Sequence, residues 1–189
     1  MNEIQLIRGQ LATERAHAAA VAEACLRALD RDQSGVLTEG SPLQQFRKAC
    51  VDYLVRVLTS FEERDQRLSE LVHAQLAPED ATRRALEQVL ARHGRSREAL
   101  EKLEAACASA QGSTPQHLWR AFVQHFNDVW GARRDAVEAL LAPNTRVGDW
   151  RAMGGIDADS ILEERRSYAR VCAMVPAGVM LPPPPGLKA

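Results

Sequence analysis

Apolar residues recur every three or four positions along four long stretches of this chain, and that spacing limits the fold more than any other feature. The stretches are rich in Ala, Leu, Glu and Arg, which are strong helix formers, and Gly and Pro separate them. The alternating pattern of a half-buried β-strand is not found in the sequence. We therefore expect an all-α chain.

The stretches between these breaks define the expected helices. They cover residues 2–29, 42–76, 79–110 and 115–143. Because a short connection returns each helix antiparallel to the one before it, we predict an antiparallel up-down-up-down four-helix bundle. A shorter fifth helix is expected up to Val175, with Ser160 and Glu163 as its capping box. The last residues contain four consecutive prolines, which favour polyproline II structure.

These elements suggest one main domain and two appendages. We expect residues 1–143 to form the four-helix bundle domain and residues 144–176 to form a loop and an accessory helix packed on the bundle. Residues 177–189 are predicted to be a solvated, proline-rich tail, because polyproline II structure has no internal hydrogen bonds.

Composition narrows the range of functions. The 24 Lys and Arg residues nearly cancel the 25 Asp and Glu residues, and no basic block or aromatic platform predicts direct nucleic-acid binding. Charged residues interrupt every apolar segment before it reaches membrane-spanning length, so we expect a cytoplasmic protein with no membrane partner. The cysteines are far apart and are predicted to be reduced core thiols: Cys25, Cys50, Cys107 and Cys172.

Two patterns resemble metal sites but lack necessary ligands. Asp30, Asp32 and Ser34 match the start of a calcium-binding loop, but Ser41 stands where a bidentate Glu is needed, so an interhelical turn is the favoured interpretation. Glu14 and His17 have the Glu-x-x-His spacing of di-iron bundles without the full ligand set. We expect neither a metal site nor a cofactor.

A polar residue interrupts each apolar stripe at a similar depth. In antiparallel helices these residues fall within roughly one turn of each other, because an α-helix rises about 1.5 Å per residue. We predict a buried polar layer that fixes helix register, with snorkelling of some side chains to the surface as the alternative. The polar layer comprises Glu14, Arg64, Asp65, His93 and Arg133. A short distance between Glu14 and Arg133 would be one sign of it.

The sequence contains no catalytic constellation that places a nucleophile, a base and an orienting group together, so we expect a protein that is not an enzyme. On the second expected helix, Gln45, Lys48, Asp52 and Arg56 lie opposite the apolar stripe. These four residues, here called the partner face, should be exposed. Ordinary solvation of the partner face is the alternative to a binding role.

A family resemblance begins on the same helix. Its residues are Leu43-Gln44-Gln45-Phe46, Val51-Asp52-Tyr53-Leu54 and Glu63-Arg64. In this order they resemble the Rsd/AlgQ family of bacterial anti-sigma regulators, which are four-helix proteins that bind the primary sigma factor of RNA polymerase. Weaker similarity extends the resemblance over residues 4–142. It departs from the family at Val57-Leu58-Thr59, where a Gly-His-Phe segment is expected, and residues 144–175 have no counterpart.

The resemblance implies a protein partner, a sigma factor, that docks on the partner face. Hemerythrin-like four-helix bundles are the next most similar group, and they imply metal binding as the alternative function. Similarity of fold alone would carry neither function to this chain.

Overall fold

The computed structural model describes residues 3–31, 40–75, 77, 81–108, 116–133 and 158–182 of the 189-residue chain. Within these residues it contains α-helices and no β-strand, which confirms the prediction of an all-α chain. The helices are α1 (Glu3–Arg31), α2 (Pro42–Gln75), α3 (Ala81–Ala108), α4 (Gln116–Arg133) and α7 (Ala158–Ala173). Among them, none combines the length with the unbroken apolar run that crossing a bilayer requires.

The start of α2 follows directly from its sequence. Pro42 occupies the first helical position, where its missing N–H would have no intrahelical partner. The hydroxyl of Ser41 accepts a hydrogen bond from the backbone N–H of Gln44 at 3.3 Å, so Ser41 caps the helix. Gly40, just before the cap, has φ of 74°, a conformation that glycine adopts without steric cost. The chain therefore turns into α2 at the position that the Gly and Pro pattern predicts.

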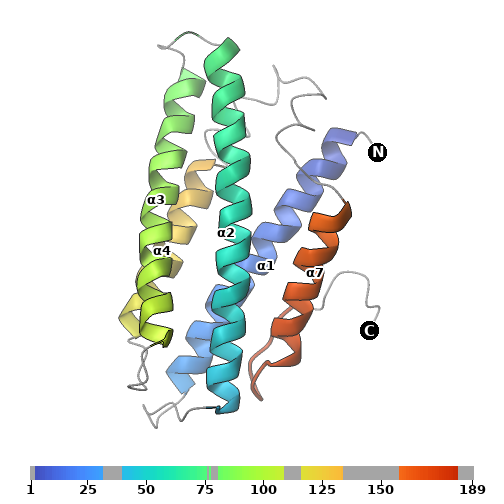
Figure 1. Ribbon diagram of the computed structural model, residues 1–189, viewed down its shortest axis with the longest axis vertical. Coiled ribbons are helices and arrows are strands. Elements are labelled where there is room, and N and C mark those ends of the chain that lie inside the picture. Colours follow the sequence, from blue (N-terminus) through green and yellow to red (C-terminus); the bar gives the residue numbers. More distant parts are fainter. Residues whose placement is uncertain are drawn as a thin grey trace.

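The helices pack in a ring of neighbours (Figure 1). α1 contacts α2, α2 contacts α3, α3 contacts α4, and α4 returns to α1. α7 lies outside this ring, along α2 and, to a lesser extent, α1. Side chains of α7 therefore meet residues that are far away in the sequence; His17 and Glu164, for example, are 147 residues apart.

The core lies between the four helices of the ring. The apolar stripe predicted for α2 is fully buried; its members are Phe46, Cys50, Tyr53, Val57, Phe61 and Leu68. On α4 the buried aromatic residues Phe122 and Phe126 pack 5.9 Å apart between ring centroids. Trp119 of α4 is also buried and meets the ring of Phe122 edge-on.

Two expectations for the C-terminal part need correction. α7 begins at Ala158, so Ser160 lies inside the helix and is not its cap; Glu163 instead forms an ion pair with Arg56 of α2. The start of the predicted solvated tail is also bound to the protein, because Val179 is buried and the carbonyl of Pro182 accepts a hydrogen bond from the hydroxyl of Tyr168 at 2.7 Å. The remaining tail, residues 183–189, lies outside the described residues.

Candidate functional site

Four members of the predicted polar layer are buried and form two pairs. In the first, Nη1 of Arg64 donates to Oε2 of Glu14 at 2.5 Å, and the amide of Gln10 donates to the other oxygen of the same carboxylate. The side chains of Glu14 and Arg64 are only 5% and 6% exposed. The guanidinium of Arg64 also lies over the ring of Phe61. This pair joins α1 to α2.

The second pair joins α2 to α3. Nε2 of His93 lies 2.8 Å from Oδ2 of Asp65, and both side chains are almost fully buried. Because Arg64 and Asp65 are adjacent in sequence, α2 directs one charged side chain toward α1 and the next toward α3. Each pair can form only when the two helices have one particular register, which is the role expected of buried ion pairs. The side chain of Arg133, the fifth predicted member, lies outside the described residues, as does its distance from Glu14.

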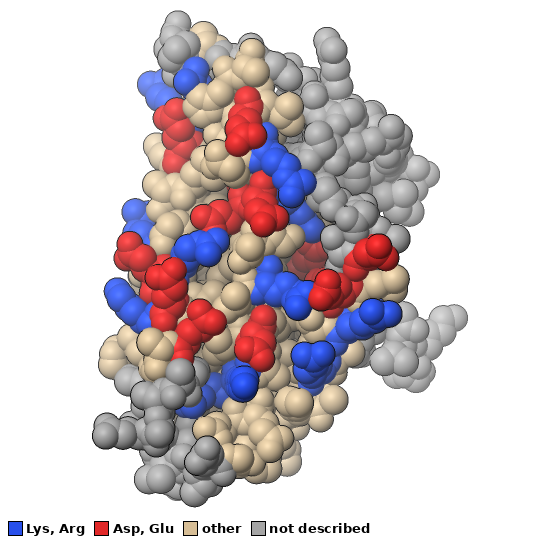
Figure 2. All heavy atoms as spheres, in the orientation of Figure 1, with Lys and Arg blue, Asp and Glu red and all other residues tan. Residues whose placement is uncertain are grey.

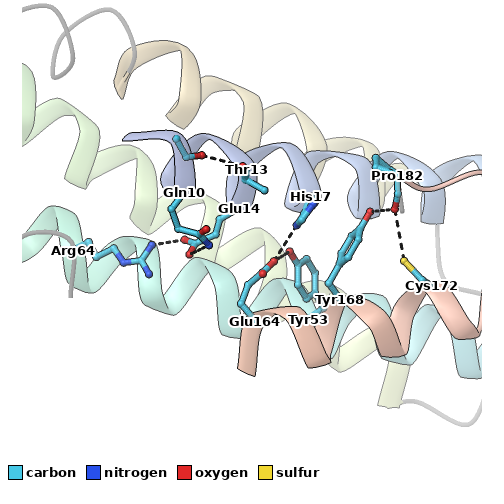
Figure 3. Close-up of polar contacts among 11 residues, drawn as sticks. Gln10, Thr13, Glu14, His17, Tyr53, Arg64, Glu164, Tyr168, Cys172 and Pro182 are labelled. Atoms are coloured by element: carbon cyan, nitrogen blue, oxygen red, sulfur yellow. Dashed lines mark hydrogen bonds and ion pairs between the residues drawn. The ribbon is translucent and has the colours of Figure 1, made fainter. Parts of the chain in front are cut away.

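A third buried contact, which sequence reasoning missed, holds α7 to the ring. Glu164 of α7 accepts a hydrogen bond from the hydroxyl of Tyr53 at 2.8 Å, and the same oxygen lies 3.2 Å from Nδ1 of His17 (Figure 3). The ring of His17 stacks on Tyr168 with centroids 4.0 Å apart. Glu14, His17, Arg64, Asp65, His93 and Glu164 together are called the polar core.

The environment of Tyr53 keeps its phenol protonated. Burial raises the pKa of Tyr53 well above its usual value, and the negative charge of Glu164 and the hydrogen bond to it raise the pKa further. Burial, followed by the neighbouring thiol of Cys172, likewise raises the pKa of Tyr168. Both phenols therefore act as hydrogen-bond donors near neutral pH, Tyr53 to Glu164 and Tyr168 to Pro182.

A hollow of about 230 Å³ opens at the junction of α1, α2 and α7. Its walls carry four carboxylates, two guanidinium groups, two hydroxyls and the side chain of Val57. Three of the charged groups, Glu14, Arg64 and Glu164, belong to the polar core and are buried. A small molecule in this hollow would therefore meet charges of both signs that are shielded from solvent.

The partner face lies on α2. Gln45, Lys48, Asp52 and Arg56 are exposed, opposite the buried stripe. Arg56 is engaged within the chain through its ion pair with Glu163 of α7, so α7 borders the partner face. Acidic and basic side chains are interspersed over the side of the molecule formed by α2, α3 and α7, and neither sign dominates it (Figure 2).

Of the three predicted calcium ligands, the structure describes only Asp30. Asp30 forms a hydrogen-bonded ion pair with Arg120 of α4 at 3.2 Å, while Asp32 and Ser34 lie outside the described residues. Over the ranges that the structure describes, no group of three or more His, Cys, Asp or Glu side chains could hold a metal ion. Glu14 and His17, the Glu-x-x-His pair, have different partners, Arg64 and Glu164.

The cysteines largely occupy the predicted positions. Cys25 and Cys50 are buried free thiols, and Cys172 is a half-buried free thiol; the side chain of Cys107 lies outside the described residues. Burial raises the pKa of Cys25, and its hydrogen bond with Cys50 raises it further, against an opposing effect of Arg47. A thiol with a raised pKa is a poor nucleophile, so Cys25 acts as a core residue.

Periodicity could have located only part of this site. Tyr53 and Tyr168 lie on apolar stripes, but such a stripe does not reveal which acceptor a phenol will find. Glu164 lies three residues after Ile161 and four before Tyr168, so helical spacing places it, and not the exposed Glu163, on the apolar stripe; that spacing is the signal that could have found it.

Comparison of the chain with protein-family models finds no match, and comparisons with curated proteins and with solved structures find none either.

Proposed function

We propose that this chain is a non-catalytic regulatory protein of the bacterial cytoplasm that binds a protein partner through the partner face. The candidate partner is the primary sigma factor of RNA polymerase, which such a protein would sequester. The observation that carries this proposal is the exposure of Gln45, Lys48 and Asp52 on a helix whose opposite side is buried. The resemblance of residues 43–64 to anti-sigma regulators gives the partner its identity.

The proposed architecture is an antiparallel up-down-up-down bundle of α1 to α4, with α7 as an accessory helix. The ring of contacts among α1, α2, α3 and α4 supports it, because each helix packs against its neighbours in sequence and α4 closes the ring on α1. A rigid scaffold of this kind holds side chains on one helix in a fixed arrangement. The partner face would therefore bind without first having to be ordered.

The pairing within the polar core favours a binding protein over the alternative, a hemerythrin-like metal protein. The Arg64 guanidinium already supplies positive charge to Glu14, and the carboxylate of Asp65 already meets His93. A cation at either position would have to compete with a group that is covalently part of the chain. Metal analysis of protein purified without chelators tests this: near-stoichiometric iron, zinc or manganese would overturn the regulatory proposal.

The direct test is charge reversal at the centre of the partner face. Asp52→Arg should leave the helix intact, because Arg is a better helix former than Asp by a few tenths of a kcal/mol. If Asp52 meets a basic helical surface, repulsion replaces attraction, which at a partly desolvated interface costs on the order of 2 to 5 kcal/mol. Calorimetry against the sigma factor should then show affinity reduced at least about thirtyfold.

Glu98→Arg provides the matched control, since Glu98 is an exposed carboxylate on α3, away from the partner face. It makes the same change in net charge and should bind almost as the wild type does. Equal losses in Asp52→Arg and Glu98→Arg would mean that only net charge matters. If wild-type protein does not bind the sigma factor, the sigma assignment is wrong; normal binding by Asp52→Arg would instead exclude the partner face.

A further inference from the structure

The hollow between α1, α2 and α7 has the size of a small metabolite. At about 30 Å³ for each water molecule in the liquid, its volume of about 230 Å³ corresponds to about eight waters. That is less than the range of about 300 to 1,000 Å³ typical of sites for drug-sized ligands. A ligand of roughly eight to ten non-hydrogen atoms would fill it.

Arg64 provides a buried positive charge on one wall. Its side chain is 6% exposed, and Nη1 donates to Glu14. Within the described part of the chain this is its only hydrogen-bonded side-chain partner, which leaves Nε and Nη2 to serve a ligand. A guanidinium with two adjacent N–H groups to spare has the geometry to bind a carboxylate in a bidentate manner.

Glu164 provides a buried negative charge from α7. Its Oε1 already accepts from Tyr53 and faces His17, whereas Oε2 has no donor among the residues that the structure describes. The side chain is 10% exposed and lines the hollow. A carboxylate oxygen in such a place is an acceptor for an ammonium group, and the low local dielectric strengthens that bond.

The rest of the wall shows which charges remain for a ligand. Glu14 is paired with Arg64, and Glu163 with Arg56, so four of the six charged side chains that line the hollow form two ion pairs. The pair with Glu14 uses only Nη1 of Arg64, so its Nε and Nη2 still face a ligand. Oε2 of Glu63 lies 3.6 Å from Nη2 of Arg67, in a solvent-exposed ion pair. Ser60 and Thr59 add hydroxyls that can donate or accept.

We propose that this hollow is a binding site for a small zwitterion of the amino-acid type. The ligand's carboxylate meets Nε and Nη2 of Arg64, and its ammonium group meets Oε2 of Glu164. Because Glu164 comes from α7 and Arg64 from α2, the bound ligand joins α7 to the ring of helices. The site shares Arg56 with the partner face, and it would allow a metabolite to stabilise the docked position of α7.

The first experiment compares ligands that carry both charges with ligands that carry one. The probes are L-glutamine, L-threonine and γ-aminobutyrate as zwitterions, propionate as the carboxylate alone, and propylammonium as the amine alone. Calorimetry on the full chain should show saturable binding of at least one zwitterion at or below about 1 mM. Propionate and propylammonium should each bind at least about tenfold more weakly, because each makes only one of the two charge-assisted contacts.

Propylammonium that binds as tightly as the best zwitterion would overturn the role of Arg64 and make the hollow a cation site. If none of the three zwitterions saturates below about 10 mM, the proposal is wrong. Neither result bears on the partner face, because these titrations contain no protein partner.

A second experiment fills the hollow without removing a charge. Ser60→Phe places a ring in the space and should abolish zwitterion binding, while Ser60→Ala keeps the space open and should reduce affinity by no more than about tenfold, the loss of one hydrogen bond. Circular dichroism checks that both variants are folded. Wild-type affinity in folded Ser60→Phe would show that the ligand binds elsewhere.

Glu164→Gln tests the ammonium subsite should Ser60→Phe not fold. The amide oxygen can still accept from Tyr53, but the negative charge is lost. Zwitterion affinity should fall at least about tenfold, while the weaker binding of propionate should not decrease. An unchanged preference for zwitterions over propionate would overturn the assignment of Glu164.

Discussion

Two regions between the helices are filled in different ways. The apolar region, where α1, α2 and α4 meet, consists mainly of carbon-rich side chains and thiols, among them Cys25, Phe46, Cys50 and Phe122, with the buried guanidinium of Arg47 close enough to act on Cys25. The polar core instead places three buried acid–base pairs between α1, α2, α3 and α7. Apolar contacts stabilise in proportion to the area they bury and tolerate small shifts. An ion pair, in contrast, forms in only one arrangement of its two helices. We therefore assign stability mainly to the apolar region and the fixing of helix register to the polar core.

The largest effect should follow from breaking one buried pair. Arg64→Met leaves the carboxylate of Glu14 buried without its cation, which should destabilise the protein by about 3 to 5 kcal/mol. Replacing both partners, as Glu14→Leu with Arg64→Met, should recover most of that loss, because no unpaired charge remains. Urea unfolding followed by circular dichroism measures both. A double variant no more stable than Arg64→Met would mean that the pair itself contributes the stability.

The stability of the apolar region should depend on the volume of its side chains and not on their chemical identity. Leu54 is fully buried on α2, so Leu54→Ala should cost about 3 kcal/mol through lost burial and the cavity it leaves. Leu54→Met keeps the volume and should cost less than about 1.5 kcal/mol. Urea unfolding followed by circular dichroism measures the free energy of unfolding of both variants. Equal costs for the two substitutions would show that this region, like the polar core, requires one particular side chain.

Alkaline pH should weaken both regions, the apolar region through Cys25, whose pKa burial raises, and the polar core through Tyr53, which donates to Glu164. The folded state raises the pKa of Tyr53 above the unfolded value of about 10, so the protonated phenol contributes stability that is complete below pH 10 and is lost as the pH rises further. Stability should then fall by up to about 1.4 kcal/mol per pH unit for this one proton. Tyr53 and Tyr168 are the only tyrosines in the sequence, so tyrosinate absorbance at high pH reports these two alone.

Tyr53→Phe is the matched variant for this titration. It should lose about 1.5 to 3 kcal/mol at neutral pH, the range for a hydrogen bond to a charged group, and its stability should fall less steeply above pH 10. Tyr168→Phe removes a bond to the uncharged carbonyl of Pro182 and should cost less at neutral pH. Native wild-type protein whose tyrosines titrate near pH 10 would contradict the contacts described for Glu164.

The same two regions mark what the sequence could predict. The apolar region follows from the 3.6-residue period, and the stripe of α2 is buried at each predicted position. The position of the polar layer along the helices could also be predicted, because a polar residue interrupts each stripe. The partners could not, because the sequence does not say which guanidinium meets Glu14; in the structure Arg64 contacts it. Which side chains pair depends on how each helix is rotated about its axis and on side-chain rotamers. The period of the apolar residues gives no information on either.

The position of α7 was beyond sequence reasoning for a related reason. A helix that packs on the outside of a bundle needs only a narrow apolar stripe, and here the stripe includes Tyr168 and Val171 beside a buried carboxylate. Helical spacing places Glu164, and not Glu163, on that stripe, because Glu164 lies four residues before Tyr168. The groups that it meets there, Tyr53 and His17, lie on other helices and are not given by the spacing.

The smallest effect should come from an ion pair outside both regions. Arg97 of α3 donates from Nε to Glu62 of α2 at 2.8 Å, and the two side chains are 47% and 33% exposed. This pair also joins two helices, but water screens it, so a double-mutant cycle with Glu62→Ala and Arg97→Ala should give a coupling of only about 0.2 to 1 kcal/mol. The coupling should shrink further in 1 M salt, where the screening length is about 3 Å.

Comparison with the cycle for Glu14 and Arg64 isolates burial as the variable, because both pairs join a guanidinium to a carboxylate across two helices. We expect the buried coupling to be several times larger and less sensitive to salt, since the side chains of Glu14 and Arg64 are only 5% and 6% exposed. Equal couplings with equal salt dependence would mean that solvent screens Glu14 as well as it screens Glu62. Helix register would then have to come from the shapes of the apolar side chains alone.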